Sequence, residues 1–158
     1  MKPVINLEDL ELQPEEDGPD PKRYGVICAR IGAQKLGYNL SIVPPGKRAN
    51  PFHNHRINEE MFLILAGEGI LRFGSQEYPV RKHDVIACPP GARDVAHQLR
   101  NTGDTDLEFL ALSTKEGHEI CEFPDVNQVK VSVGDYGSIE LRHTFDVDRA
   151  VEGGPPDA

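Results

Sequence analysis

Proline and glycine recur at short intervals along this chain, and they limit the length of every segment between them. Groups such as Pro44-Pro45-Gly46 and Pro89-Pro90-Gly91 mark sharp turns. Between the turns lie short runs in which apolar and polar residues alternate, for example 36–42 and 129–133. Alternation with a period of two is typical of strands that bury one face. The spacing therefore predicts a sandwich or barrel of short strands.

Three further segments refine this expectation. Residues 61–66 form a continuous apolar run, which predicts a strand buried on both faces. A long helix is hard to place, because the best candidate, 6–16, has a weak apolar stripe and contains Pro14. Asn6 is its candidate N-cap. We interpret residues 13–23 as an arm or loop, and the expected fold class is all-β.

Length, charge and cysteine content exclude several classes of protein. At 158 residues the chain is expected to form one domain with a proper core. A net charge of −9, without basic clusters, argues against nucleic acid and anionic membrane surfaces as partners. No apolar run approaches the roughly 20 residues of a transmembrane helix. The acidic first residues do not resemble a signal peptide, and three widely spaced cysteines suggest no disulfide framework. We therefore expect a cytoplasmic protein.

The segment His53-Asn54-His55, followed by two glutamates, is the strongest indication of chemistry. Side chains at positions i and i+2 of a strand project to the same side, so His53 and His55 are expected to share one pocket. Glu60, or its neighbour Glu59, would add a carboxylate from the next strand. An HxH pattern alone is weak evidence, and His97, at the start of a distant strand, fits as a further ligand. Imidazole and carboxylate together suit Fe, Mn, Zn or Ni.

These residues form two motifs that resemble those of the cupin superfamily. The first cupin motif, G-x5-H-x-H-x3,4-E-x6-G, is matched by two glycines, two histidines and a glutamate, namely Gly46, His53, His55, Glu60 and Gly67. The second, G-x5-P-x-G-x2-H-x3-N, is similar to residues 84–101. The resemblance implies a divalent transition metal held by four ligands: His53, His55, Glu60 and His97.

Three features depart from the family pattern. Gly46 lies one residue further from the first histidine than the pattern asks. His83 stands where the second motif has a glycine, at a turn where histidine tolerates a positive φ better than most residues. Five residues, 92–96, precede His97 where the pattern has two, but the spacing from His97 to Asn101 is intact. We expect the strand that carries His97 to survive this extension.

The resemblance also implies an architecture, a double-stranded β-helix or jelly-roll barrel. We expect three parts: an N-terminal arm over 1–35 with a short helix and an extra strand, a barrel core over 36–116, and C-terminal strands with a flexible tail over 117–158. A homodimer formed through strands outside the barrel is the expected assembly. Tyr38, Arg72 and Gln98 are candidate contacts for a ligand at the barrel mouth.

Three functions remain open, because cupin-like folds host many activities. The first is an oxygenase that docks a small oxygenated substrate onto the open face of the metal. The second is an isomerase or epimerase acting on a sugar or organic acid. The third is a non-catalytic binding or sensory protein for a small molecule. The residues identify no general base, and we expect His83, His118 and His143 to be structural or solvated.

Overall fold

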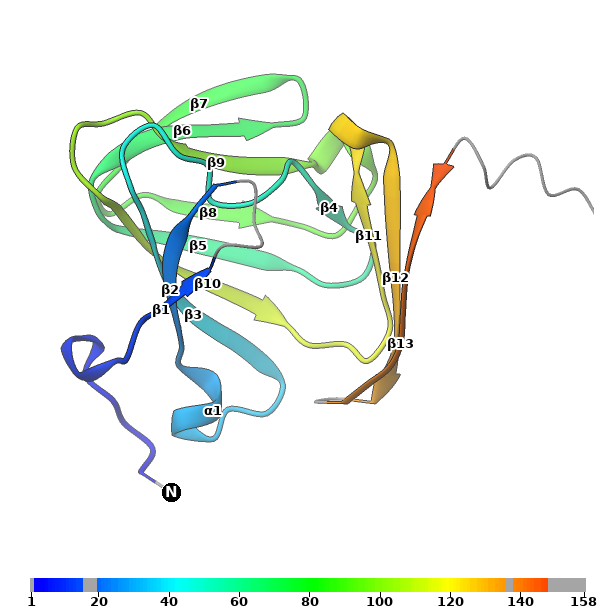
Figure 1. Cartoon of the computed structure of the whole chain (residues 1–158), viewed down its shortest axis with the longest axis horizontal. Helices are drawn as coiled ribbons and strands as arrows, with labels where there is room; N and C mark the ends of the chain where they lie inside the picture. The colour runs from blue at the N-terminus through cyan, green and yellow to red at the C-terminus, as the bar shows by residue number, and fades with distance from the viewer. Residues whose placement is uncertain (1, 16–19, 136–137, 148–158) are drawn as a thin grey trace, which may run out of the picture.

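The elements of the chain are almost all short strands, as the turn spacing predicts (Figure 1). This computed structural model describes residues 2–15, 20–135 and 138–147. In that part of the chain the longest helix is α1 (Cys28–Ile31), and no helix has the length and apolar character needed to cross a membrane. The predicted flexible tail, 151–158, lies outside the described residues.

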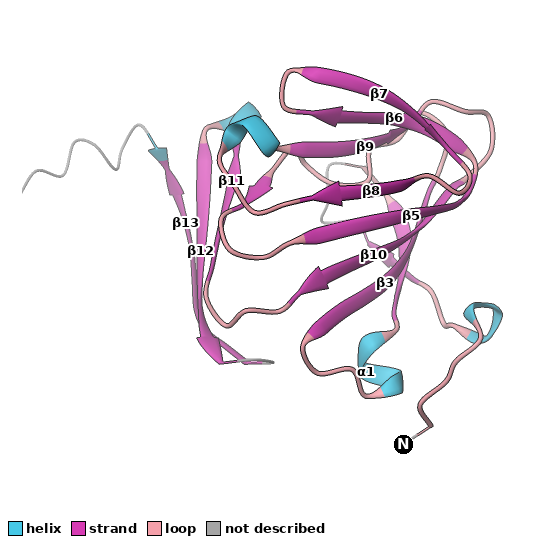
Figure 2. Cartoon of the chain, turned by 180° about the vertical axis from the view of Figure 1, so that it is seen from behind, coloured by secondary structure: helices cyan, strands magenta, loops and turns pink. Residues whose placement is uncertain are grey.

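Two antiparallel sheets form the walls of a barrel. The first has the strand order β1-β2-β3-β10-β5-β8, in which β1 (Gln13–Glu15) and β2 (Lys22–Val26) come from the N-terminal segment. The other four strands line the barrel: β3 (Leu36–Val43), β5 (Glu60–Ala66), β8 (Val85–Cys88) and β10 (Leu107–Thr114). The second has the order β7-β6-β9, with β6 (Glu68–Phe73), β7 (Gln76–Arg81) and β9 (His97–Asn101). Figure 2 shows that the strand axes of both walls have nearly the same orientation.

The path of the chain between the walls identifies the fold. After β5 in the first sheet, the chain forms β6 and β7 in the second, returns for β8, crosses again for β9 and returns for β10. Two isolated antiparallel bridges, Arg48↔Arg100 and His53↔His97, join the segment around β4 (Asn54–His55) to β9. This alternation is a double-stranded β-helix, or jelly roll. The all-β prediction is confirmed.

Aromatic and branched side chains fill the space between the walls. The rings of Phe62 and Phe109 meet edge to face with centroids 5.5 Å apart, and Ile64 beside them is fully buried. The outer face of β5 is less covered, because Met61 is 37% exposed and Leu65 is only half-buried. The prediction that residues 61–66 are buried on both faces is therefore wrong for part of the strand.

The N-terminal segment packs on the outer face of the first wall. Leu10 and Ile27 are buried there against Leu40 and Ile42 of β3. Burying one apolar side chain in this way contributes about 1.5–3 kcal/mol. The outer face of the barrel therefore has a small core of its own.

The secondary structure of this segment differs from the expectation. The helix over 6–16 is reduced to a single 3-10 turn, η1 (Leu7–Asp9), although Asn6 caps it by accepting a hydrogen bond from the backbone of Glu8. The predicted loop over 13–23 instead contains β1 (Gln13–Glu15) and the start of β2 (Lys22–Val26). The edge of β3 supplies hydrogen-bond partners to β2, and tertiary pairing overrides weak local preference.

A third sheet stands beside one end of the barrel (Figure 1). Its order is β13-β12-β11-β4, with β11 (Glu119–Phe123), β12 (Gln128–Asp135) and β13 (Ser138–Asp146). β11 joins β4 through the pairs Cys121↔His55 and Glu122↔Asn54. Residues late in the sequence therefore lie directly beside the HxH segment.

Candidate metal centre

The three histidines of the two motifs converge on one carboxylate oxygen inside the barrel. Oε2 of Glu60 lies 3.1 Å from Nε2 of His97, 3.4 Å from Nε2 of His55 and 3.6 Å from Nε2 of His53. His53 and His97 are buried, and His55 and Glu60 are half-buried. The structure therefore brings together all four residues that the motifs single out. Glu59, the alternative carboxylate, is exposed.

Backbone pairing places each of these side chains. His53 and His97 exchange both backbone hydrogen bonds, of 2.7 and 3.2 Å, across the isolated bridge, so their side chains lie on the same face. His55 lies two residues further along the same edge, and Glu60 begins β5. Period-two geometry alone accounts for the shared direction of His53 and His55.

The extra residues before His97 form a compact turn that leaves β9 in place. Arg93–Val95 is a 3-10 turn, η2, closed by hydrogen bonds from Val95 and Ala96 back to Ala92 and Arg93. Directly after it, His97 pairs with His53, and β9 continues to Asn101. The prediction that the strand survives the extension is confirmed. His83, in the glycine position of the second motif, has a φ of 78° as expected.

In two of the imidazoles, the ring nitrogen that is turned away from Glu60, Nδ1, lies close to a backbone carbonyl oxygen. Nδ1 of His53 lies 2.8 Å from the carbonyl oxygen of Pro51, and Nδ1 of His97 lies 3.2 Å from that of Val95. A carbonyl oxygen only accepts, so each of these contacts is a hydrogen bond when Nδ1 carries the proton. In that tautomer the lone pair of each Nε2 is directed to the space beside Glu60. This is the orientation that a metal-binding imidazole requires.

His55 has a different outer neighbour. Its Nδ1 lies 3.3 Å from Oε2 of Glu119 in β11, and neither of its buried ring nitrogens has a hydrogen-bond partner of good geometry among the described residues. Sequence reasoning missed Glu119. The alternation of Glu119, Cys121 and Phe123 on one face of a strand was the available signal, but nothing local tells which strand β11 pairs with.

The charges of the cluster residues favour the binding of a cation. Burial opposes the charge on Glu60, but the three surrounding imidazoles outweigh it and hold the pKa of its carboxyl well below the usual range. Burial lowers the pKa of His53. Burial also acts against the charge on His55, but Glu119 and Glu60 raise its pKa to about 9. The two carboxylates therefore favour a positive charge on His55.

The donor set fits a divalent transition metal. One ligand atom each from His53, Glu60 and His97 lies within 4.8 Å of the others, and His55 approaches the same carboxylate oxygen. The buried Nε2 of His55 lacks a hydrogen-bond partner of good geometry, and its lone pair would coordinate a bound cation. Three imidazoles and one carboxylate suit Zn, Mn, Fe or Ni rather than Ca or Cu(I).

Aromatic rings and two thiols surround the cluster. The ring of Phe123 stacks on His53 with centroids 6.2 Å apart, and Phe62 lies 5.8 Å from His97. Cys88 and Cys121 are buried and free. Burial raises the pKa of Cys121 to about 12, and burial with the charge of Glu60 raises that of Cys88 further above its usual range. Both remain protonated thiols near neutral pH, so neither is an activated nucleophile.

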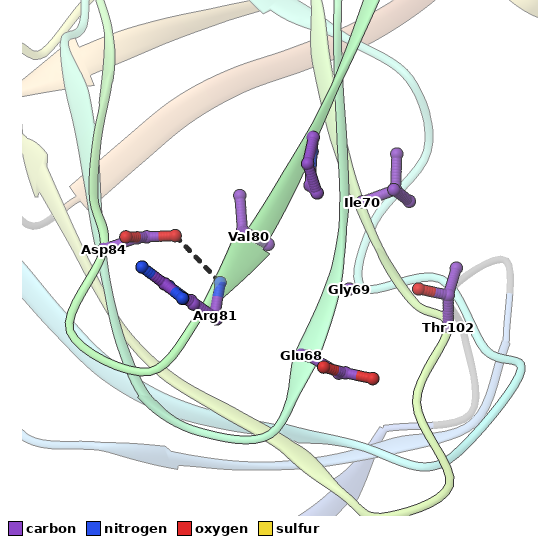
Figure 3. Close-up of a pocket in the computed structure, with 8 residues that line it drawn as sticks. Glu68, Gly69, Ile70, Val80, Arg81, Asp84 and Thr102 are labelled. Atoms are coloured by element: carbon purple, nitrogen blue, oxygen red, sulfur yellow. Dashed lines mark hydrogen bonds between the residues drawn. The ribbon is translucent and has the colours of Figure 1, made fainter.

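Some cavities of the described residues lie outside the cluster. One, of about 570 Å³, is formed by β6 and β7 with Asp84 and Thr102, and none of the cluster residues line it (Figure 3). Another, of about 400 Å³, lies between the 48–52 loop and the third sheet and is lined by Phe123, the ring that stacks on His53.

Of the candidate ligand contacts, Gln98 lines the cavity beside the third sheet, where its amide also donates to the carbonyl of Asn50. Arg72 pairs with Asp125 and lies over the ring of Phe52, and both of these partners line the same cavity. Tyr38 packs in the small outer core.

The fold and the cluster together define the class of protein: a small jelly-roll barrel with imidazoles and a carboxylate gathered inside it. Residues 39–113 match the family described as Cupin domain. This region is therefore a single cupin domain.

Solved structures resemble this chain over nearly its whole length. A putative sugar phosphate isomerase from Acidithiobacillus ferrooxidans superposes with a TM-score of 0.79 at 20% identity, covering 93% of this chain and 94% of that one. A sugar phosphate isomerase of the cupin superfamily from Silicibacter pomeroyi gives 0.78 at 22% identity, covering 99% and 98%. At these identities the likeness shows a shared fold.

A curated relative matches a shorter region more closely. The oxalate-binding protein of Thermotoga maritima is 37% identical over 70 residues, which are 44% of this chain and 54% of that protein. The chain spans about half the length of the first curated relatives it matches.

Proposed function

We propose that this protein binds a divalent transition metal through His53, His55, Glu60 and His97, and that the metal binds a small oxygenated molecule. The convergence of three imidazole Nε2 atoms on a single oxygen of Glu60 carries this proposal. An octahedral ion with four protein ligands keeps two positions for the ligand. A molecule with two neighbouring oxygens, such as oxalate or a hydroxyketone, suits that pair of positions.

The residues of the chain prepare the site before a ligand arrives. The backbone partners of His53 and His97 hold the two rings, which lowers the entropy lost on binding. Glu60 remains ionised and lowers the net charge of the site. Phe62 and Phe123 pack against the imidazoles and limit the access of water. When bound, the metal would act as a Lewis acid towards the oxygens of the ligand.

The oxalate-binding relative supports a ligand of this chemistry, because oxalate presents two adjacent oxygens to a metal. The first test is elemental analysis of protein purified without added metal, in the wild type and in a His53→Ala/His55→Ala variant. We expect about one equivalent of Zn, Mn, Fe or Ni in the wild type and little in the variant. Wild-type protein without stoichiometric metal, or a variant that retains it, would refute the site.

The second test uses oxalate as the probe. Calorimetric titration should show metal-dependent binding to the loaded wild type and none to protein treated with a chelator. Binding that persists without metal would show that oxalate occupies another site.

A second candidate function is isomerisation of a sugar phosphate. The likeness to the two sugar phosphate isomerase structures favours it, because it covers nearly the whole chain. The test is an NMR assay of aldose and ketose phosphates in D2O with Mn- and Zn-loaded protein. Interconversion or solvent exchange at the carbon next to the carbonyl would support this function. Iron as the native metal, with O2 consumption, would favour an oxygenase instead.

We further propose that the protein is cytoplasmic and forms a homodimer through strands outside the barrel. Three free, buried cysteines are consistent with a reducing compartment. Size-exclusion chromatography with light scattering should give twice the mass of the chain. A monomeric mass would refute the dimer.

A further inference from the structure

Glu119 lies outside the residues that match the cupin family, yet its carboxylate reaches the metal-site cluster. We propose that Glu119 is a positioning residue of the metal centre, which holds His55 by Nδ1 so that Nε2 faces the metal. The proposal rests on the metal site put forward above. It assigns the third sheet a part in that site, because β11 carries Glu119 to the outer side of the HxH segment.

The carboxylate of Glu119 is fixed by hydrogen bonds from the turn that links β4 to β5. Its Oε1 accepts hydrogen bonds from the backbone N–H groups of Arg56, Ile57 and Ile120. Its Oε2 accepts from both the backbone and the side-chain amide of Asn58. An oxygen held by this many donors stays in one place and stays ionised.

Asn58 extends this network to β10. Its side-chain oxygen accepts from the hydroxyl of Thr114, at 3.0 Å, and from the backbone of Glu116, at 2.8 Å. The same hydroxyl accepts from the backbone of Glu59, directly before the ligand Glu60. Glu119 and Asn58 therefore hold the segment from His55 to Glu60 against two other strands.

His55 differs from the other two histidines of the site, because the neighbour of its Nδ1 is a side chain and not a backbone carbonyl. His53 and His97 have backbone carbonyls at Nδ1, whereas Nδ1 of His55 lies 3.3 Å from the carboxylate of Glu119, an ion-pair contact without good hydrogen-bond geometry. The negative charge of a carboxylate beside the ring makes the imidazole a more basic ligand than a neutral carbonyl does. His55 should therefore bind the metal more strongly than an unsupported imidazole would.

A purely structural role for Glu119 makes a different prediction. If its carboxylate only closes the turn at 56–58, its loss would lower the stability of the protein but leave the metal affinity of the folded protein unchanged. Metal affinity measured on folded protein therefore separates the two roles.

The experiment compares two substitutions in the same strand. Glu119→Gln removes the carboxylate beside His55. Glu122→Gln is the matched control, because it removes a carboxylate that pairs with Arg56 and Asn54 and touches no histidine. Zinc affinity is measured by competition with a chromophoric chelator at one pH, after circular dichroism has confirmed folding. We expect Glu119→Gln to weaken zinc binding by about 10- to 100-fold, and Glu122→Gln to remain close to the wild type.

A measurement on the wild type keeps the proposal testable if Glu119→Gln does not fold. In the zinc-loaded protein, NMR of the imidazole nitrogens should show His55 bound through Nε2, with a proton on Nδ1 that exchanges slowly with water. Coordination through Nδ1, an unbound His55, or equal affinities for folded Glu119→Gln and Glu122→Gln would each overturn the proposal. If the wild type binds no metal at all, the proposed metal site itself fails.

Discussion

Asn101, at the end of the strand that carries His97, should be among the most sensitive polar positions in the protein. Its side chain is 1% exposed and makes three hydrogen bonds. The amide donates to the carbonyls of Val43 and Thr105, both at 2.8 Å, and its oxygen accepts from the backbone of Gly103 at 3.0 Å. One side chain therefore joins the end of β3 to the turn between β9 and β10, a role that asparagine often has in turns.

The cost of Asn101→Ala follows from these bonds. Each net hydrogen bond contributes about 1 kcal/mol, and a buried carbonyl left without a donor, such as that of Val43, costs about 1–3 kcal/mol. With about 2 kcal/mol for the two other bonds, the sum is a loss of about 3–5 kcal/mol, a large part of the 5–15 kcal/mol typical of a domain. With a typical urea m-value of about 2 kcal/mol/M, the midpoint should fall by about 1.5–2.5 M.

The assay is urea denaturation of metal-free protein followed by circular dichroism. Thr102→Ala is the control, because Thr102 is the exposed neighbour in the same turn, and its change should stay within about 0.5 kcal/mol. A loss of less than about 1 kcal/mol for Asn101→Ala, at an unchanged m-value, would refute the view that this side chain clamps the turn.

Three further outcomes are expected. His83→Gly should raise the stability by about 0.5–1 kcal/mol in thermal denaturation, because the φ of 78° suits glycine better than histidine; a lower melting temperature would contradict this. The contact with Arg48 lowers the pKa of Asp20, so its contribution to stability is present above the ordinary value of about 3.9 and is lost as pH falls through the folded value. The difference in urea midpoint between wild type and Asp20→Asn should therefore shrink below about pH 4, and a difference independent of pH would count against it. Zinc at about 100 times its Kd should stabilise the wild type by about 2.7 kcal/mol and His97→Ala by much less, as measured by the shift in melting temperature; an equal shift in both would exclude His97 as a ligand.

Much of the site could be predicted, because the direction of a side chain in a strand depends on its position within that strand. The common direction of His53 and His55 follows from the period of two, and the positive φ of His83 follows from its place in a turn. The choice between Glu60 and Glu59 could not be predicted, because it depends on the register of β5 against β8 and β10. A shift of one residue would have exchanged their faces.

The sequence by itself determined the class of fold and the residues that gather in the barrel. Short segments in which apolar and polar residues alternate, between prolines and glycines, favour strands. Two motifs mark the ends of the strands that carry His53, His55 and His97. The tertiary structure decided what surrounds them. It turned the arm at 13–26 into two strands that extend the first sheet beyond β3, and it brought Glu119 and Phe123 to the histidines by pairing β11 with β4. The physical reason is that a strand reveals its own inward and outward faces, whereas its partner is chosen by the packing of segments about 65 residues apart, which no local pattern encodes.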